Sequence, residues 1–386
     1  MSFLGYPRQN GSVGTRNYIG IISTVTCAND VTWWISQQVK GCAPFLHDQG
    51  CGQTQPDLNQ VTRTLISLGW NPNLAGVLLV SLGCESVLVD EIAEGIAKSG
   101  KPVEKIVIQK VGGAIAALSQ GSKLVQSMLT DASKIKREEF PDSELLLGVK
   151  CGASDTTSGL TSNPATGAVC DLLIDKGGTC VFGETTEFMG AEHILARRAA
   201  TPQVANKIID IVARMEKRAN AMGFDMRGGQ PTTGNIAGGL TTIEEKSLGA
   251  IVKGGTKPIQ EVYEYGERPQ GKGLSIVDTP GREPEFLTAL GAAGAQVIIF
   301  STGLGAPQGF PFIPVIKVTG NPITYERLSV HLDVFIELAD KAGSGIDRAG
   351  EALYQEVLAV ASGKQTKAEI INYGNFPHIF TVGPVI

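Results

Sequence analysis

The chain has 386 residues, of which 42% are hydrophobic and 18% charged, and its net charge is −5. This composition is that of a globular protein, and the lack of a basic cluster argues against a nucleic-acid partner. No apolar run has the length of a membrane span, and the N-terminus lacks the apolar core of a signal peptide. We therefore expect a cytoplasmic protein with no membrane partner, whose cysteines are reduced.

Short runs rich in Val, Ile and Leu alternate with amphipathic segments along the chain. Continuous apolar runs are typical of strands that are buried on both faces of a sheet. We predict strands at 17–24, 75–83, 105–111, 145–150, 178–184, 273–279, 295–303 and 313–320. Helical patterns fall between them, at 30–41, 60–69, 89–100, 170–178 and, longest, 201–223. This alternation predicts an α/β fold of mostly parallel sheets with flanking helices.

The length of the chain and two interruptions of the pattern predict two or three α/β domains. A charged, irregular segment occupies 133–144, and a second break lies at 262–273. We therefore expect an N-terminal domain at 1–140, a central domain at 141–270 and a C-terminal domain at 271–386.

Four cysteines stand where an α/β protein binds its ligands. Cys27, Cys84 and Cys151 lie at or just past the end of a predicted strand, and ligands of open α/β sheets bind beyond these ends. Cys51 lies between two glycines, four residues after His47. Thiolates with an imidazole suit iron, zinc or an iron–sulfur cluster, although the spacing matches no standard metal motif. The alternative is that the four cysteines are small apolar core residues.

Polar residues cluster after the strand that ends at Cys151. The segment GVKCGASDTTSGLTSNPATG, at 148–167, carries Ser154, Asp155, Ser158 and Asn163 between a strand end and a helix start. Such a loop favours binding of an anionic substrate, and the alternative is a helix-capping loop. The candidates outside this loop are Arg16, a carboxylate fork; Glu184 and Glu187, after another strand; Asn235, in a glycine-rich segment; and Lys246, on the helix that follows.

Seven motifs occur in order along nearly the whole chain: RNYIGIISTVTCAN, HDQGCGQ, VSLGCES, GVKCGASDTTSGLTSNPATG, GETTEFMGAEHIL, GNIAGGLTTIEEKSLGAIVKGG and GLSIVDTPG. Together they resemble the altronate and galactarate dehydratase family. That family also includes the large subunit of (2R)-sulfolactate sulfo-lyase.

The resemblance implies a metal-dependent lyase that eliminates a β-leaving group from a small 2-hydroxy acid and yields a 2-keto acid. It implies iron, as Fe²⁺ or as an iron–sulfur cluster, or another divalent metal, and the expected ligand pool is Cys27, His47, Cys51, Cys84 and Cys151. The substrate would be oriented by Arg16, Ser154, Asp155, Ser158, Asn163 and Asn235. The general base would be His47, Glu184 or Lys246, and the sequence does not choose among them.

Three features depart from the family pattern. The dehydratases carry an additional small β-rich domain, which is a separate subunit in the sulfo-lyase, so we expect a small β-rich partner subunit as well as a homo-oligomer. Ile236 and Leu304 stand where the family often has a basic residue, and Ala153 stands where it usually has glycine. Sugar-acid dehydration leads the predicted activities, and sulfite elimination from sulfolactate follows. A non-catalytic scaffold subunit is the alternative from another class.

Overall fold

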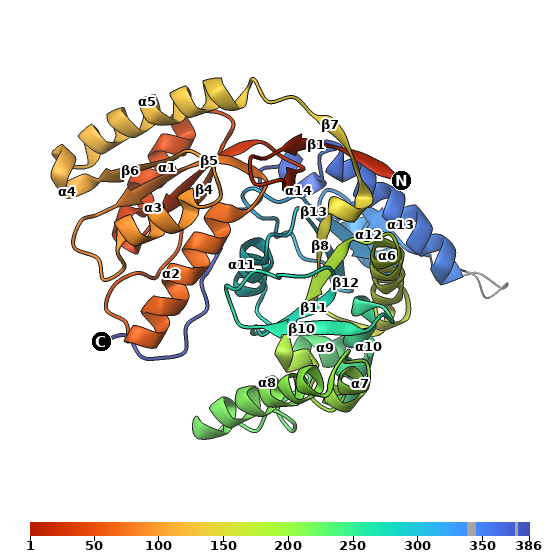
Figure 1. The fold of residues 1–386 in the computed structure, drawn as a ribbon. Helices are drawn as coiled ribbons and strands as arrows, with labels where there is room; N and C mark the ends of the chain where they lie inside the picture. Colours follow the sequence, from red (N-terminus) through yellow and green to blue (C-terminus); the bar gives the residue numbers. More distant parts are fainter. Residues whose placement is uncertain (338–344, 375–376) are drawn as a thin grey trace.

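Two parallel sheets, each covered by helices, form most of the structure (Figure 1). The structure is a computed structural model that describes residues 1–337, 345–374 and 377–386. It confirms the predicted α/β fold of mostly parallel sheets with flanking helices. Among the described residues, no helix combines the length and the apolar character that crossing a membrane requires.

The first unit is a four-stranded parallel sheet in the order β4-β3-β5-β6. Its strands are β3 (Tyr18–Ser23), β4 (Cys42–Phe45), β5 (Leu74–Ser81) and β6 (Val103–Val107). The helices of this unit are α1 (Asn29–Gln38), α2 (Gln55–Trp70), α3 (Val89–Ala97), α4 (Ile108–Val111) and α5 (Ala114–Ala132). Helical crossovers between parallel strands place helices on both faces of the sheet.

The alternation of side chains along β5 shows how each face acquires its helical layer. Leu78 and Val80 belong to one buried cluster with residues of α1 and α5. Val77 and Leu79 belong to another cluster with residues of α2 and α3. Because successive strand residues point to opposite faces, a continuous apolar strand requires a covering layer on each side.

The second unit is a seven-stranded sheet in the order β10-β11-β9-β8-β12-β13-β14, and all its neighbours are parallel. Its strands are β8 (Leu146–Gly152), β9 (Thr179–Phe182), β10 (Ile259–Tyr263), β11 (Gly273–Val277), β12 (Val297–Thr302), β13 (Val315–Thr319) and β14 (Val334–Phe335). The boundary expected near residue 270 falls between β10 and β11, which pair with each other. The expected central and C-terminal domains therefore share one sheet, and their division stays a prediction.

Helices cover both faces of the second sheet and join it to the first unit. Side chains of α6 (Asn163–Asp175) and α13 (Gly345–Ala361) share one buried cluster with the strands. On the other face, α11 (Glu283–Ala293) shares a cluster with α2 of the first unit, which includes Leu65 and Leu290. The two sheets thus have a common apolar core along the contact of α2 with α11.

The remaining elements surround these units. A small antiparallel sheet in the order β2-β1-β7 consists of β1 (Ser2–Pro7), β2 (Val13–Gly14) and β7 (Glu138–Pro141). The other helices are α7 (Glu192–Arg197), α8 (Pro202–Ala221), α9 (Thr233–Ala237), α10 (Ile243–Ile251), α12 (Pro322–Arg327) and α14 (Lys367–Ile370).

All eight predicted strands are present, and α8 is the longest helix of the described residues, as the pattern predicted. The prediction for the end of the 105–111 strand was wrong, because residues 108–111 form α4. The sequence analysis missed the short strands β1, β2, β4, β7, β10 and β14 and, among the longer helices, α5, α11 and α13. Short edge strands lack the long apolar run on which the predictions depended.

Candidate active site

Three of the candidate thiols lie at one edge of the first sheet. Cys27, Cys51 and Cys84 follow β3, β4 and β5, which are neighbouring parallel strands, and all three side chains are exposed. Their loops contact one another through the backbone. Thr26 N–H donates to the carbonyl of Gln49 at 3.2 Å, and Ser86 N–H donates to the carbonyl of Gly50 at 3.0 Å. The edge is therefore one connected surface rather than three separate loops.

His47 stabilises this edge through both of its ring nitrogens. Its Nε2 lies 2.7 Å from the carbonyl oxygen of Ser23, and its Nδ1 accepts the N–H of Gln49 at 3.1 Å. Burial lowers the pKa of His47 to about 4, so the ring is neutral at physiological pH. In this arrangement neither nitrogen is free to bind a metal or to take a proton from a substrate.

The five expected metal ligands do not form one group. Cys151 lies on the second sheet and is 1% exposed, whereas the other three thiols lie at the edge of the first sheet. Across residues 1–337, 345–374 and 377–386, no set of three or more His, Cys, Asp or Glu side chains is placed to hold a metal ion. The ligand pool expected from the sequence is therefore not assembled in this structure.

A second cluster lies at the ends of β8 and β9, where two lysines and two glutamates meet without solvent. Lys253 Nζ lies 2.6 Å from Glu184 Oε2 and 2.7 Å from Glu187 Oε2. Lys150 Nζ lies 3.1 Å from Glu184 Oε1. Lys150, Glu184 and Lys253 have no exposed surface, and Glu187 is 5% exposed. The two lysines balance these two glutamates, as burial requires, and Lys150 Nζ also lies 3.8 Å from Glu283 Oε1, whose side chain is 27% exposed.

The electrostatics of this cluster hold Lys253 in its charged form. Burial alone would lower the pKa of Lys253, but the carboxylates of Glu184 and Glu187 outweigh burial and raise it. Burial acts on Glu184 in the other direction and raises its pKa, while Lys150 and Lys253 oppose this shift. Lys253 is thus a fixed positive charge beside the two carboxylates.

Cys151 borders the ionic cluster. Its N–H donates to Glu184 Oε2 at 3.0 Å, its Sγ lies 3.0 Å from Ser154 Oγ, and Asn163 Nδ2 donates to Sγ at 3.4 Å. Burial raises the pKa of the thiol to about 11, so Cys151 is protonated at neutral pH. The Oδ1 of Asn163 is buried and has no hydrogen-bond partner among the described residues.

The loop after Cys151 is held by side chains from two other segments, which carry Asn235 and Asn321. Asp155 Oδ1 accepts from Ser158 N–H at 2.9 Å, and its Oδ2 accepts from Asn321 Nδ2 at 2.8 Å. Asn235 Nδ2 donates to the carbonyl of Ser154 at 2.9 Å. The structure therefore brings together the expected substrate-binding residues Ser154, Asp155, Ser158, Asn163 and Asn235.

Two other predicted residues have different surroundings. Arg16 is buried, and its guanidinium pairs with Glu369 at 2.7 Å and donates to backbone carbonyls that include that of Val360. Through these contacts Arg16 joins the N-terminal segment to α13 and α14, and its guanidinium is engaged by them. Lys246, on α10, is half-buried, and its Nζ donates to Gln230 Oε1 at 3.3 Å. Helix α10 packs against the segments 185–187 and 252–254, which carry Glu187 and Lys253, so Lys246 lies near the ionic cluster. Burial raises the pKa of Glu187, but the charges of Lys253 and then Lys246 outweigh burial and lower it.

The sequence analysis missed Lys150, Lys253 and Asn321. A lysine in the middle of the apolar runs LLLGVKC and GAIVKGG was a usable signal, because a buried lysine needs an acidic partner. Nothing in the local sequence of Asn321 indicates its contact with Asp155, which is 166 positions away.

Two residues beside the cluster have left-handed backbone conformations. Glu184 has φ of 70° and Ala153 has φ of 50°. This region costs an L-residue about 1–2 kcal/mol and costs glycine little. Strain of this kind is concentrated at functional sites.

We expect Ala153→Gly to raise the free energy of unfolding by up to about 1 kcal/mol, because glycine removes the strain at φ of 50°. Urea unfolding of the variant beside the wild type measures this change. A matched Ala196→Gly change in α7, where the backbone is helical, should instead lower the stability by about 0.5–1 kcal/mol. Destabilisation by both changes would contradict the strain at Ala153.

Comparison with known proteins identifies the family. The sequence pattern of the D-galactarate/altronate dehydratase C-terminal region matches residues 142–384. The pattern of the D-galactarate dehydratase/altronate hydrolase second domain matches residues 5–133. The chain belongs to the D-galactarate/altronate dehydratase family. Both residue clusters described above lie within the matched segments.

Curated relatives match along most of the chain. The chain is 37% identical to (2R)-sulfolactate sulfo-lyase subunit beta of Chromohalobacter salexigens, over 97% of this chain and 96% of that protein. It is 36% identical to altronate dehydratase of Bacillus subtilis, over 84% of this chain and 67% of that protein. It is 33% identical to galactarate dehydratase (L-threo-forming) of Escherichia coli, over 94% and 73%. A solved structure, the S. aureus MnaA–UDP co-structure, aligns with a TM-score of only 0.24 at 10% identity over 93% of each chain, which supports no inference.

Proposed function

We propose that this protein is a lyase that eliminates a β-leaving group from a small 2-hydroxy acid and releases a 2-keto acid. The observation that carries the proposal is the buried Lys150–Glu184–Lys253–Glu187 cluster beside Cys151 and the Ser154–Asn163 loop. The relatives named above are dehydratases and a sulfo-lyase subunit, which supports the same reaction class.

The proposed chemistry needs positive charge near the substrate carboxylate. Removal of the proton α to a carboxylate builds up a second negative charge, and fixed cations in a dry site stabilise it. Lys150 and Lys253 are such cations, held by glutamates before any substrate binds. The free Oδ1 of Asn163 is an acceptor for a substrate hydroxyl in the same place.

Among the three predicted bases, the surroundings favour Lys246. Both nitrogens of His47 are hydrogen-bonded to the backbone, and Glu184 is engaged by two lysines. Lys246 is half-buried, and among the described residues its Nζ donates only to the side-chain amide of Gln230. We assign proton abstraction to Lys246 in its uncharged amine form, which requires that the ammonium of the free protein lose its proton when substrate binds; the ammonium formed by abstraction then returns that proton to the departing group.

Replacement of Lys246 by methionine should lower kcat by at least about 100-fold and leave the fold intact, because a general base contributes a factor of this size. The assay follows 2-keto acid formation from altronate, galactarate and (2R)-sulfolactate. Lys217→Met, an exposed lysine on α8, is the matched control and should retain full activity. Unchanged turnover in Lys246→Met would reject Lys246 as the base.

Dehydration of a sugar acid leads among the activities, and sulfite elimination from sulfolactate to pyruvate is the second candidate. The second candidate is kept because the match to the sulfo-lyase beta subunit extends over nearly the full length of both proteins. Because that relative is named a subunit, we also propose a small β-rich partner subunit, and a homo-oligomer stays a prediction. A purely scaffolding chain is excluded if Lys246→Met abolishes activity in the presence of the partner.

Iron is a proposal that rests on the resemblance and on donor chemistry. Cys27, Cys51 and Cys84 are exposed thiols at one sheet edge, and soft thiolates suit iron. Iron held there would supply Lewis-acid chemistry at the first sheet, whereas the Cys151 cluster lies on the second.

Protein purified without oxygen should contain iron, and Cys84→Ser should remove most of it. The half-buried Cys42, on β4 of the same sheet, gives the matched control Cys42→Ser, which should keep its iron. Metal analysis and acid-labile sulfide measurement on the three proteins check the proposal, and sulfide distinguishes a cluster from a single ion. Equal iron content in both variants would exclude Cys84 as a ligand.

A further inference from the structure

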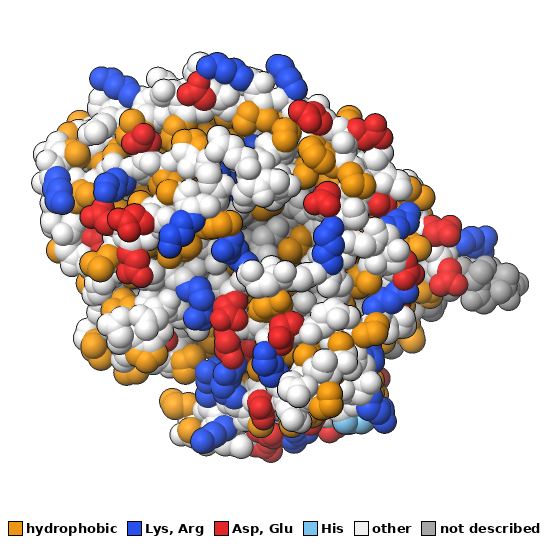
Figure 2. Space-filling model, viewed as in Figure 1, with side chains coloured by type: hydrophobic (Ala, Val, Ile, Leu, Met, Phe, Trp, Pro, Cys, Tyr) orange, Lys and Arg blue, Asp and Glu red, His pale blue; other side chains and the backbone are white. Residues whose placement is uncertain are grey.

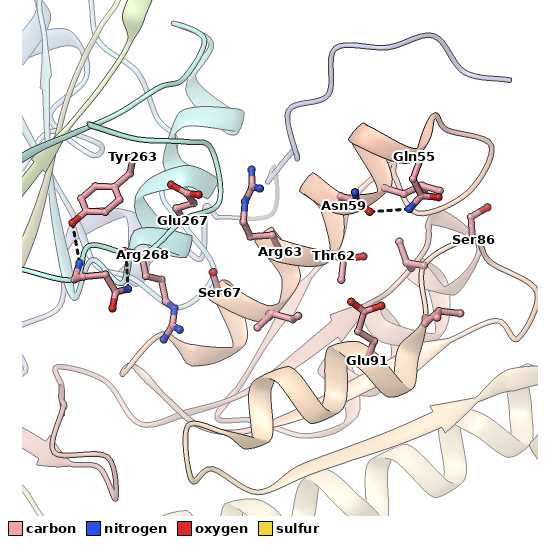
Figure 3. Close-up of a pocket in the computed structure, with 15 residues that line it drawn as sticks. Gln55, Asn59, Thr62, Arg63, Ser67, Ser86, Glu91, Tyr263, Glu267 and Arg268 are labelled. Atoms are coloured by element: carbon pink, nitrogen blue, oxygen red, sulfur yellow. Dashed lines mark hydrogen bonds between the residues drawn. The ribbon is translucent and has the colours of Figure 1, made fainter. Parts of the chain in front are cut away.

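A groove of about 750 Å³ lies between α2 of the first unit and residues 263–270 of the second. Figure 3 shows Arg63 and Ser67 of α2 on one side and Glu267 and Arg268 on the other. Its volume is within the range of small-molecule sites, and such sites occur preferentially where two units meet. None of the residues that line it belongs to the Cys151 cluster.

Arg268 is a cation without a counter-ion. Its guanidinium stacks on the indole of Trp70, with Cζ 3.7 Å from the ring centroid. The guanidinium makes no hydrogen bond or ion pair with any residue that the structure describes, although the backbone carbonyl of Arg268 accepts from Gln270 Nε2 at 2.9 Å. Burial lowers the pKa of Arg268, which reports that its charge is partly desolvated. Stacking fixes the plane of the guanidinium and leaves its N–H groups available to an anion.

Ser67 contributes a second free donor. It is 5% exposed and lines the groove, and its hydroxyl has no partner in the described part of the chain. Arg63, one helical turn earlier, donates Nε and Nη2 to the carbonyl of Tyr265 at 3.0 and 2.7 Å. That contact anchors the guanidinium of Arg63 in the groove wall without neutralising it.

Other cationic groups lie near Arg268. The buried ammonium of Lys101 has a lowered pKa, first because of burial and then because of the charges of Arg8 and Arg268. Figure 2 shows lysine and arginine side chains, with aspartate and glutamate side chains among them, around the hollow where the two units meet on this face. The groove also contains Glu267, whose Oε2 accepts the N–H of Glu264 at 2.9 Å, and Glu91, which is exposed on the first turn of α3. The lining thus holds two arginines and two glutamates, and no described carboxylate pairs with the guanidinium of Arg268.

We propose that this groove is a second ligand site that binds a small organic or inorganic anion, a carboxylate or a phosphate, through Arg268, Arg63 and Ser67. The site spans the two units, so an occupant contacts both. Anion binding in this groove does not depend on which acid the lyase converts.

Titration calorimetry of the full chain with citrate and, separately, with inorganic phosphate tests the proposal. We expect saturable binding of at least one anion, and the one that binds identifies the preferred chemistry. Arg268→Gln should weaken this binding by about tenfold or more, because it removes a charge-assisted contact. Arg268→Lys, which keeps the charge and loses the planar fork, should give an intermediate affinity.

Arg197→Gln is the matched control, because Arg197 is an exposed arginine on α7, outside the groove lining. It should bind as the wild type does, and sodium chloride at equal ionic strength should give no saturable heat. Thermal unfolding confirms that each variant is folded, and Ser67→Ala provides a second test if Arg268→Gln is not. Absence of saturable binding of either anion to the wild type, or equal affinity in Arg268→Gln and wild type, would overturn the proposal.

Discussion

Lys253→Met is expected to lower the free energy of unfolding by about 3–5 kcal/mol, because it leaves two buried carboxylates without their shared cation. Lys253 has no exposed surface, so water cannot replace the lost partner. Methionine has a similar length and fills the same space, which limits the loss of packing. Urea unfolding of the variant and the wild type measures the difference.

A nearby lysine separates the burial effect from the loss of a charge. Lys257 pairs with Asp175, whose side chain is 62% exposed, and Lys257→Met should leave the stability almost unchanged. Adding Glu187→Gln to Lys253→Met should recover part of the lost stability, because it removes one unpaired carboxylate. Equal stability of Lys253→Met and Lys257→Met would contradict the buried cluster.

The second large effect is a loss of stability in acid that depends on His47. Burial lowers its pKa from 6.5 to about 4 in the folded protein. Below pH 6.5 the unfolded chain therefore binds a proton that the folded chain does not. The contribution of neutral His47 to the free energy of unfolding is therefore complete above pH 6.5 and falls as the pH is lowered. It is lost at about pH 4, and the total change is about 3 kcal/mol.

Unfolding measured between pH 7.5 and 4 for the wild type and for His47→Gln checks this effect. Glutamine does not titrate, so between pH 7.5 and 4 the variant should lose about 3 kcal/mol less of its unfolding free energy than the wild type. The loss of the His47 contacts with Ser23 and Gln49 should also lower the stability of the variant by the same amount at every pH. Parallel pH profiles for the two proteins, or a His47 pKa near 6.5 from NMR titration, would show that the ring is not desolvated.

The sequence predicted the strands with the strongest local signals. The apolar runs at 75–83 and 295–303 are buried on both faces, and these became β5 and β12. Short strands such as β10 could not be predicted, because five residues at the margin of a sheet carry too little pattern. The predicted strand 105–111 was too long, because the apolar residues at 108 and 111 belong to the short helix α4.

The candidate site was predicted only where it is local in the sequence. The loop from Ser154 to Asn163 follows β8 directly, and its polar composition indicated a binding role. Its partners Asn235 and Asn321 come from distant segments, and only the first was among the candidates. Lys150 was overlooked because it lies inside an apolar strand and its acidic partner is 34 positions away.

By itself, the sequence determined the alternation of strands and helices, the placement of cysteines at strand ends and the motifs of the family. These depend on side-chain periodicity and on the residues next to one another in the chain. The tertiary structure alone decided that Cys151 ends a strand of a different sheet from Cys27, Cys51 and Cys84, and that both nitrogens of His47 are occupied. It also paired Lys253 with Glu184 and brought α2 against residues 263–270. Such contacts follow from the order of strands in the sheets and from how the two units pack, and no local pattern encodes either.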